Sequence, residues 1–196
     1  MIVTIHQPEH FPYEGFFQKM DCADLFIVLD CVKYRKNYFQ NRNKFLNKQG
    51  SEEWFGVSVP KSSTSKMIKD VVTVDNSLNH WRKKVIKKIS HNLKMDATSI
   101  YEHEKLIDIN MRSIEWCRER MNITTPIIYA SSLGVTGSKT DLLLDICKRT
   151  EASIYLSGPS GKDYLELEKF KTSNIKVDFF SPQVKNYYSM LYNLNM

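Results

Sequence analysis

Two short apolar runs near the N-terminus constrain the fold of this chain most strongly. Residues 1–5 and 25–29 are dominated by Ile, Val, Leu and Phe, and both runs are too short for a buried helix. Between them, residues 15–21 place Phe16 and Met20 four positions apart, which puts both side chains on one side of a short helix. Short continuous apolar runs are typical of parallel strands buried on both faces. The sequence therefore predicts a β-α-β unit at the start of an α/β domain.

The same alternation returns in the C-terminal third of the chain. Strands are predicted at residues 127–130, 153–156 and 175–180, with helices over 139–149 and 163–171. The whole pattern predicts an α/β fold, a Rossmann-like three-layer domain with a mostly parallel sheet that extends over residues 1–196.

The stretch from 37 to 121 has a different character and is predicted to be a β-hairpin and helical insertion within that single domain. Its hairpin is expected from residues 38–46 and 54–59, and a further strand near 71–74. A helix is expected from residue 76 onward, with Trp81, Val85, Ile89 and Leu93 inward, and a second one over 100–121. The cations between Arg82 and Lys88 are interpreted as a solvated helix face.

Composition excludes several classes of protein. A hydrophobic fraction of 42% predicts a packed core, and 28 Lys and Arg against 22 Asp and Glu give a net charge of +6, which favours an anionic partner. No apolar run approaches the roughly 20 residues of a membrane helix, and no signal peptide is evident, so a cytoplasmic protein without a membrane span is expected. The cysteines lack metal or redox spacing and are interpreted as buried, reduced side chains: Cys22, Cys31, Cys117 and Cys147.

The loop after the first strand is the first candidate site. His6, Gln7 and His10 lie there, at the edge of the sheet where ligands bind in open α/β folds. Residues 6–10 read H-x-x-E-H, but Pro8 prevents the helix that would place both imidazoles on one metal, so no metal site is expected. His6 is predicted to act as a general acid–base or as a hydrogen-bond donor to a phosphate, or else to be a structural side chain at a strand end. The loop also loosely resembles the histidine turn of nucleotidylyl transferases.

Polar and aromatic residues follow the second strand, from Asp30 to Asn43. Cations, aromatic rings and amides in this stretch suit a nucleotide sugar, whose pyrophosphate needs cations and whose hydroxyls need amides. A track for single-stranded nucleic acid is the less favoured interpretation, and a solvated hairpin is the third. The residues selected here are Lys33, Tyr34, Asn41, Arg42 and Asn43.

Two glycine-containing loops in the C-terminal third complete the candidate set. The loop over 134–140 resembles a phosphate-binding loop, although Ser138 stands where that motif requires glycine. The loop over 157–163 repeats the arrangement one unit later, and both could instead be ordinary strand-to-helix turns. The residues selected are Lys139, Thr140, Ser157, Gly158, Gly161 and Lys162.

Several of these segments together resemble the WbqC-like protein family. The matching blocks are Ile5-His6-Gln7-Pro8, Gly15-Phe16-Phe17, Gln40-Asn41-Arg42-Asn43, Ser138-Lys139-Thr140 and Tyr155-Leu156-Ser157-Gly158-Pro159. The resemblance implies a role in bacterial surface-polysaccharide synthesis, of O-antigen or capsule, and it implies no particular reaction or cofactor.

These observations lead to one functional hypothesis with two alternatives. The chain is expected to transfer an acyl or aminoacyl group to a nucleotide-linked amino sugar, with a nucleotide sugar or another phosphorylated small molecule as its partner. His6 would be the base, held in its tautomer by Asp30 or Asp163. The alternatives are a nucleotidylyl-transferase-like enzyme using Mg²⁺, or a non-catalytic module that binds a nucleotide sugar or RNA. The proposed phosphate ligands are Lys33, Arg42, Lys139 and Lys162, and the proposed sugar ligands are Gln7, Asn41 and Asn43.

Overall fold

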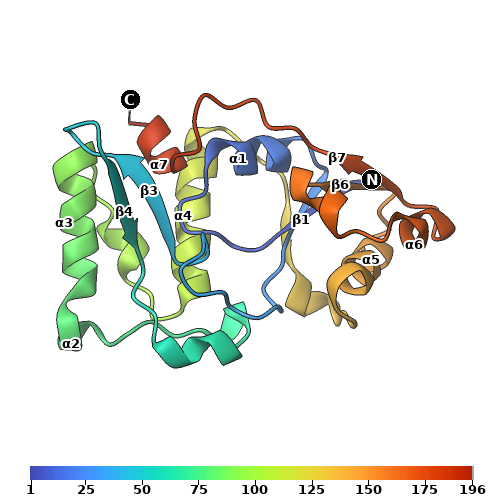
Figure 1. Ribbon diagram of the computed structural model, residues 1–196, viewed down its shortest axis with the longest axis horizontal. Helices are drawn as coiled ribbons and strands as arrows, with labels where there is room; N and C mark the ends of the chain where they lie inside the picture. The colour runs from blue at the N-terminus through green and yellow to red at the C-terminus, as the bar shows by residue number, and fades with distance from the viewer. Residues whose placement is uncertain (196) are drawn as a thin grey trace. The chain divides into compact units, whose positions relative to one another are not determined.

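A computed structural model describes residues 1–195 of the protein (Figure 1). One part of the protein is built around a parallel sheet of five strands. The strand order is β5-β2-β1-β6-β7, and every neighbouring pair is parallel. The strands are β1 (Ile2–His6), β2 (Leu25–Val28), β5 (Ile127–Tyr129), β6 (Ile154–Ser157) and β7 (Lys176–Phe179). Together with the helices between the strands, this sheet confirms the predicted Rossmann-like α/β fold.

Apolar side chains of the strands and helices form the core around this sheet. Phe16 on α1 (Glu14–Asp21) packs on Phe26 of β2, with ring centroids 5.2 Å apart. Tyr155 of β6 stacks on Phe170 of α6 (Leu167–Thr172) at 5.5 Å. Helix α5 (Lys139–Arg149) begins and ends where its apolar pattern predicts, because Ile146 and its apolar neighbours form one buried stripe.

The chain divides into two compact units, each made of several segments. The first unit consists of residues 1–7, 15–30 and 123–184 and contains the five-stranded sheet. The second consists of residues 8–14, 31–122 and 185–196, and its long middle segment contains the stretch predicted as an insertion.

The second unit is built on an antiparallel hairpin, as predicted. Its strands are β3 (Arg42–Leu46) and β4 (Glu52–Gly56), and Phe45 and Phe55 are buried on one face. The helices of this unit are α2 (Asn76–Asn79), α3 (Trp81–Leu93), α4 (Leu106–Arg120) and α7 (Met190–Asn193). Short 3-10 helices lie at η1 (Lys61–Ser65), η2 (Ile68–Asp70) and η3 (Thr98–Tyr101), and in the first unit at η4 (Ala130–Leu133) and η5 (Pro159–Asp163).

The predicted boundaries of the two long helices are wrong, and Arg82 explains one of them. Its guanidinium donates to the carbonyls of Tyr101 at 2.6 Å and His103 at 2.5 Å, and these bonds stabilise the non-helical chain that precedes the helix. Helix α4 therefore starts at Leu106. The helix expected from residue 76 is broken at His80, whose φ of 51° lies in the left-handed region.

The predicted strand near residues 71–74 and the predicted start of the helix over 163–171 are also wrong. Residues 71–74 form no named strand, because only Val72 pairs, in an isolated bridge with Lys105. The helix expected over 163–171 begins at Leu167, since residues up to Asp163 are already wound into η5. None of the helices between residues 1 and 195 has the length and apolar character needed to span a bilayer.

Candidate functional site

The carboxyl ends of β1 and β6 mark the point where the order of the sheet reverses. The chain proceeds from β1 to β2 and β5 on one side, and then returns to β6 on the other side of β1. Pairing between β1 and β6 covers Ile2 with Ile154 and Val3 with Tyr155, and the next carbonyl, of Leu156, accepts from the Thr4 hydroxyl at 2.8 Å. Ligands of doubly wound folds bind outside the strand ends at such a reversal.

His6 lies at this edge as a neutral proton acceptor. Its Nδ1 is 2.9 Å from the carbonyl oxygen of Gln7, which can only accept, so Nδ1 carries the proton and Nε2 keeps its lone pair. Burial and, secondarily, the nearby Lys19 ammonium lower the pKa of His6 to about 3. The ring also meets Phe16 edge to face at 4.8 Å, which fixes its plane.

The two carboxylates expected to orient His6, those of Asp30 and Asp163, have other surroundings in the structure. Asp30 is buried, and its two oxygens accept from the main-chain N–H of Ser131 at 2.9 Å and from its hydroxyl at 2.6 Å. Asp163 is exposed in η5. The predicted tautomer-holding role of these carboxylates is therefore wrong, because the carbonyl of Gln7 already fulfils it.

The loop after β6 is tightly packed at one glycine and open at the other. A Cβ on Gly161 would collide with the Ser157 hydroxyl, whereas a Cβ on Gly158 would meet nothing within 4 Å. The hydroxyl of Ser157 donates to the Gly158 carbonyl at 3.2 Å. Lys162 is exposed and its Nζ lies 5.4 Å from the centre of the Phe179 ring.

The loop before α5 is closed by the protein itself. Asp145 accepts from the N–H of Thr136 at 2.8 Å, so a carboxylate already occupies the amide that a phosphate would need. Thr140 is buried, and its hydroxyl lies 3.5 Å from the carbonyl of Tyr164 and 3.4 Å from the N–H of Glu166. Lys139 remains exposed, with φ at 51°. Of the selected residues in this loop, Lys139 alone presents a charge to solvent.

In the second unit, Asn43 is part of the scaffold. It is buried, and its amide donates to the carbonyls of His10 at 3.3 Å and Phe11 at 2.8 Å. The ring of His10 is also buried and its Nε2 lies 2.9 Å from the Tyr101 hydroxyl. Desolvation lowers the pKa of His10 to about 3. The amide predicted to orient a sugar thus fastens the N-terminal loop of this unit.

Three residues selected from the sequence are among those of the second unit that carry a buried polar atom without a hydrogen-bond partner: the Tyr34 hydroxyl, Oδ1 of Asn41 and Nε of Arg42. Burial raises the pKa of Tyr34 to about 12, and the Arg42 charge acts in the opposite direction. Lys33, by contrast, is exposed, with its main chain bridged to Met67.

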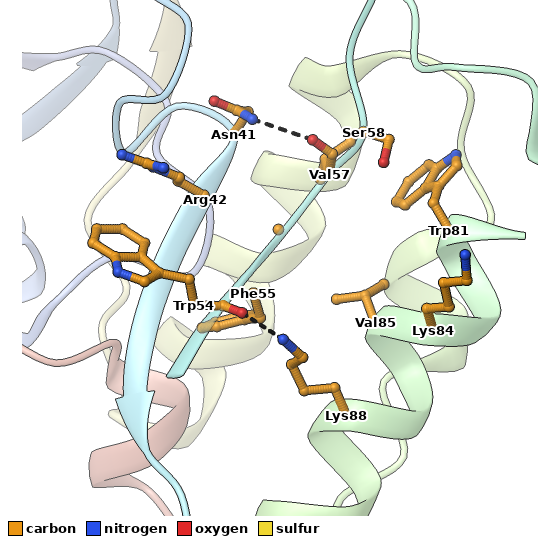
Figure 2. Close-up of a pocket in the computed structure, with 11 residues that line it drawn as sticks. Asn41, Arg42, Trp54, Phe55, Val57, Ser58, Trp81, Lys84, Val85 and Lys88 are labelled. Carbon is orange, nitrogen blue, oxygen red and sulfur yellow. Dashed lines mark hydrogen bonds between the residues drawn. The ribbon is translucent and has the colours of Figure 1, made fainter. Parts of the chain in front are cut away.

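Asn41 and Arg42 line a cavity of about 340 Å³ along strand β4, opposite helix α3 (Figure 2). Arg42 stacks over the Trp54 indole, with Cζ 4.3 Å from the ring centre. From α3, Lys88 donates to the Trp54 carbonyl at 2.7 Å, and Lys84 and Trp81 line the same cavity (Figure 2). Trp54, Trp81, Lys84 and Lys88 were not selected from the sequence.

The cationic face of α3 is only partly solvated. Arg82 is held by main-chain carbonyls, and Lys88 pairs with Glu53 at 3.2 Å, whereas Lys83, Lys84 and Lys87 are exposed. Two of the four cysteines, Cys117 and Cys147, are buried as expected, and Cys22 is exposed. Within residues 1–195, no three His, Cys, Asp or Glu side chains cluster as a metal site would require.

Comparison with known proteins places this architecture in a family. An uncharacterized protein of Mycobacterium tuberculosis (strain ATCC 25618 / H37Rv), Rv1507c, is 26% identical over 193 residues, which are 91% of this chain and 81% of the relative. No solved structure matches the chain significantly. The profile of the WbqC-like protein family matches residues 7–193, a range that covers most of both units and all but the first of the residues selected from the sequence. The chain belongs to the WbqC-like protein family.

Proposed function

We propose that this protein is an enzyme of bacterial surface-polysaccharide precursor synthesis that transfers an acyl or aminoacyl group to the amine of a nucleotide-linked amino sugar. The observation that carries the proposal is the state of His6. Its ring is neutral, fixed in one tautomer by the Gln7 carbonyl, and located where β1 and β6 separate at the reversal of the sheet. The family name supports the pathway, and the geometry supports the chemistry.

In the proposed reaction, the sugar amine attacks the carbonyl carbon of an activated acyl ester. A C–N bond forms and the bond to the leaving group breaks. Nε2 of His6 accepts the proton that the nitrogen loses, and then passes it to the departing thiolate or alkoxide. The amide and the protonated leaving group are the products, so no oxidant or metal is needed to balance the step.

The low pKa of His6 fits this role once an anionic substrate is bound. Burial is the main cause of that low pKa, and the positive charge of Lys19 lowers it further. A phosphate beside the edge of the sheet would offset this charge and make the imidazole a stronger base. The exposed cations Lys139 and Lys162 in the same unit would attract that phosphate.

The test is an assay of N-acylation with nucleoside-diphosphate amino sugars and acetyl or aminoacyl thioesters, with products detected by mass. His6→Gln removes the proton acceptor and is expected to lower kcat by roughly 10²- to 10⁴-fold. His91→Gln, on the exposed part of α3, is the matched control. Wild-type turnover by a folded His6→Gln protein would overturn the role of His6.

A further inference from the structure

Helix α3 presents basic side chains on one exposed face of the second unit. Residues 76–95, which include this helix, contain six Lys or Arg and no Asp or Glu. Lys87 follows Lys83 by four positions and Lys84 by three, so the three side chains lie on one side of the helix, and all of them are exposed. Within residues 1–195, none of the three has an ion-pair partner.

The opposite side of α3 is fixed to the rest of the second unit. Val85 and Ile89 are buried there, and so is Trp81, whose indole N–H donates to the carbonyl of Val74 at 2.8 Å. These buried side chains set the rotation of the helix about its axis. The exposed lysines are therefore held toward solvent as a fixed row of ammonium groups.

Two further lysines extend this row along the helix. Lys84 and Lys87 line a surface depression together with Asn92, and Asn92 in turn lines the next depression together with Lys48 and Lys94. Both of these additional lysines are exposed. The resulting surface follows the 13 residues of α3, a distance of about 20 Å. We call it the lysine face, and it consists of Lys48, Lys83, Lys84, Lys87 and Lys94.

Carboxylates near the lysine face already have partners. Glu53 lines one of the depressions, but it pairs with Lys88 at 3.2 Å. Asp75 and Asp96, before and after the helix, each accept from the main-chain N–H two positions further along, at 2.9 Å. The positive charge of the lysine face is therefore available to an external anion. Lysine is a strongly hydrated point charge without a fixed fork of donors, so such a row suits an extended anionic surface better than one precisely shaped ligand.

An exposed leucine lies close to one end of the lysine face. Leu78 of α2 is 76% exposed, more than any other large apolar side chain in residues 1–195, and no residue of this short helix is buried. Helix α2 directly precedes α3 and lies at one end of it (Figure 1). A leucine beside unpaired cations is typical of surfaces that contact anionic bilayers, where the apolar side chain enters the boundary between headgroups and acyl chains.

The other residues of α3 favour a membrane over a nucleic acid. Single-stranded nucleic acids stack their bases on exposed aromatic rings, but Trp81 is only 4% exposed. Arg82, the one arginine of the helix, is occupied by main-chain carbonyls. We infer that the lysine face and Leu78 bind the anionic surface of a lipid bilayer, with the lysines at the headgroup phosphates and Leu78 at the edge of the acyl chains. This inference does not depend on the proposed reaction.

Sedimentation of the full chain with lipid vesicles tests the inference. Vesicles of equal parts phosphatidylglycerol and phosphatidylcholine are expected to bind the protein at least about tenfold more strongly than vesicles of phosphatidylcholine alone, and added salt should reduce this difference. No binding to the anionic vesicles or equal binding to both kinds would overturn the inference. Tighter binding to a DNA duplex or to oligothymidylate, at the same concentration of phosphate groups, would overturn the choice of a membrane.

Glutamine substitutions locate the binding surface. The combined variant Lys83→Gln, Lys84→Gln and Lys87→Gln is expected to weaken binding to the anionic vesicles by on the order of 100-fold, because each lysine near such a surface contributes about fivefold. The matched control carries the same change at three exposed lysines in and between η1 and η2 of the same unit: Lys61, Lys66 and Lys69. The control is expected to lose less than about threefold. Equal losses in the two variants would show that net charge alone attracts the protein, and would overturn the location.

A serine substitution tests the contact of Leu78 with the acyl chains. Leu78→Ser is expected to weaken binding to the anionic vesicles by about tenfold, because the apolar side chain no longer gains from leaving water. Leu167→Ser, at a leucine of α6 that is 46% exposed, is the matched control and is expected to bind as the wild type does. Circular dichroism establishes that both variants are folded. Unchanged binding by a folded Leu78→Ser protein would overturn the role of Leu78.

Discussion

Ser131 donates two hydrogen bonds to the carboxylate of Asp30, one from its main-chain N–H at 2.9 Å and one from its hydroxyl at 2.6 Å. This pair connects the end of β2 with the start of η4, next to the end of the neighbouring strand β5. A buried carboxylate with both oxygens bonded is a structural group, although its position at the sheet edge is that of a catalytic one.

Replacement of Asp30 by Asn should therefore reduce stability. The amide group would set a donor against the Ser131 donors, and the free energy of unfolding is expected to fall by about 1–3 kcal/mol. Asp163→Asn changes an exposed side chain and should stay within about 0.5 kcal/mol of the wild type. Urea denaturation followed by circular dichroism compares the two, and equal stabilities would contradict the structural role of Asp30.

Two histidines with lowered pKa values, the half-buried His6 and the buried His10, should make stability depend on pH. Their pKa values are lowered from 6.5 to about 3, so between these limits the unfolded chain binds protons that the folded chain does not. The free energy of unfolding is therefore fully retained with respect to these rings above pH 6.5. It falls as the pH is lowered toward 3, by up to about 1.4 kcal/mol per pH unit for each ring.

Denaturation at several pH values between 6.5 and 4.5 measures this slope. His6→Gln is expected to remove about one proton from it, whereas His91→Gln, exposed on α3, should leave the slope of the wild type. A His6→Gln protein with an unchanged slope would show that His6 is not held neutral.

Gly56 and Gly158 should respond in opposite ways to alanine. A Cβ at Gly56 would lie 2.8 Å from Cα of Arg42 and closer still to the carbonyl oxygen of Asn41, so the two strands would have to separate. Gly56→Ala is expected to destabilise by roughly 1–3 kcal/mol. Gly158 has φ at −69° and open space, so Gly158→Ala should be neutral or stabilising by up to about 1 kcal/mol. Thermal denaturation of both variants is the measurement.

The two asparagines at the start of the hairpin should differ in how much each contributes to stability. Asn43→Ala removes both donors to the His10 and Phe11 carbonyls and is expected to lower stability by about 2–4 kcal/mol. Asn41 makes one bond, to the Val57 carbonyl at 3.2 Å, so Asn41→Ala should lose about 1 kcal/mol. Urea denaturation of both variants is the measurement, and equal losses of stability would contradict this difference.

The fold could be predicted largely because its strands and helices have strong local patterns. The apolar stripe of α5 fixes both its ends, and the runs in β1 and β2 admit few other interpretations. Helix starts were missed where a distant residue intervenes. Arg82 captures the carbonyls of Tyr101 and His103, and no pattern within residues 100–121 reveals that contact.

The candidate site was only partly accessible to sequence reasoning, for a similar reason. Asn41 and Asn43 look alike in the sequence, but Asn43 lies within β3 and is buried against the carbonyls of His10 and Phe11, whereas Asn41 precedes the strand and lines the cavity. In the sequence, Lys84 and Lys88 look like part of an ordinary cationic helix face. Only the packing of α3 against β4 shows that they line the cavity. The cations Arg42 and Lys44, two positions apart on one strand, were the available signal for the stacking on Trp54, which pairs with Lys44 across the hairpin.

The central position of β1 has a consequence for how this protein acquires its structure. One partner, β2, follows within the first 28 residues, but the other, β6, begins at Ile154, and Thr4 bonds a carbonyl 152 positions away. On the ribosome, the first strand must therefore wait with one edge unpaired until most of the polypeptide has emerged. Sheets that are completed by such distant segments fold slowly, and their unpaired strand edges are prone to aggregation until the last strand pairs. We expect refolding to be slow and sensitive to protein concentration, and shortened chains that end before β6 to aggregate.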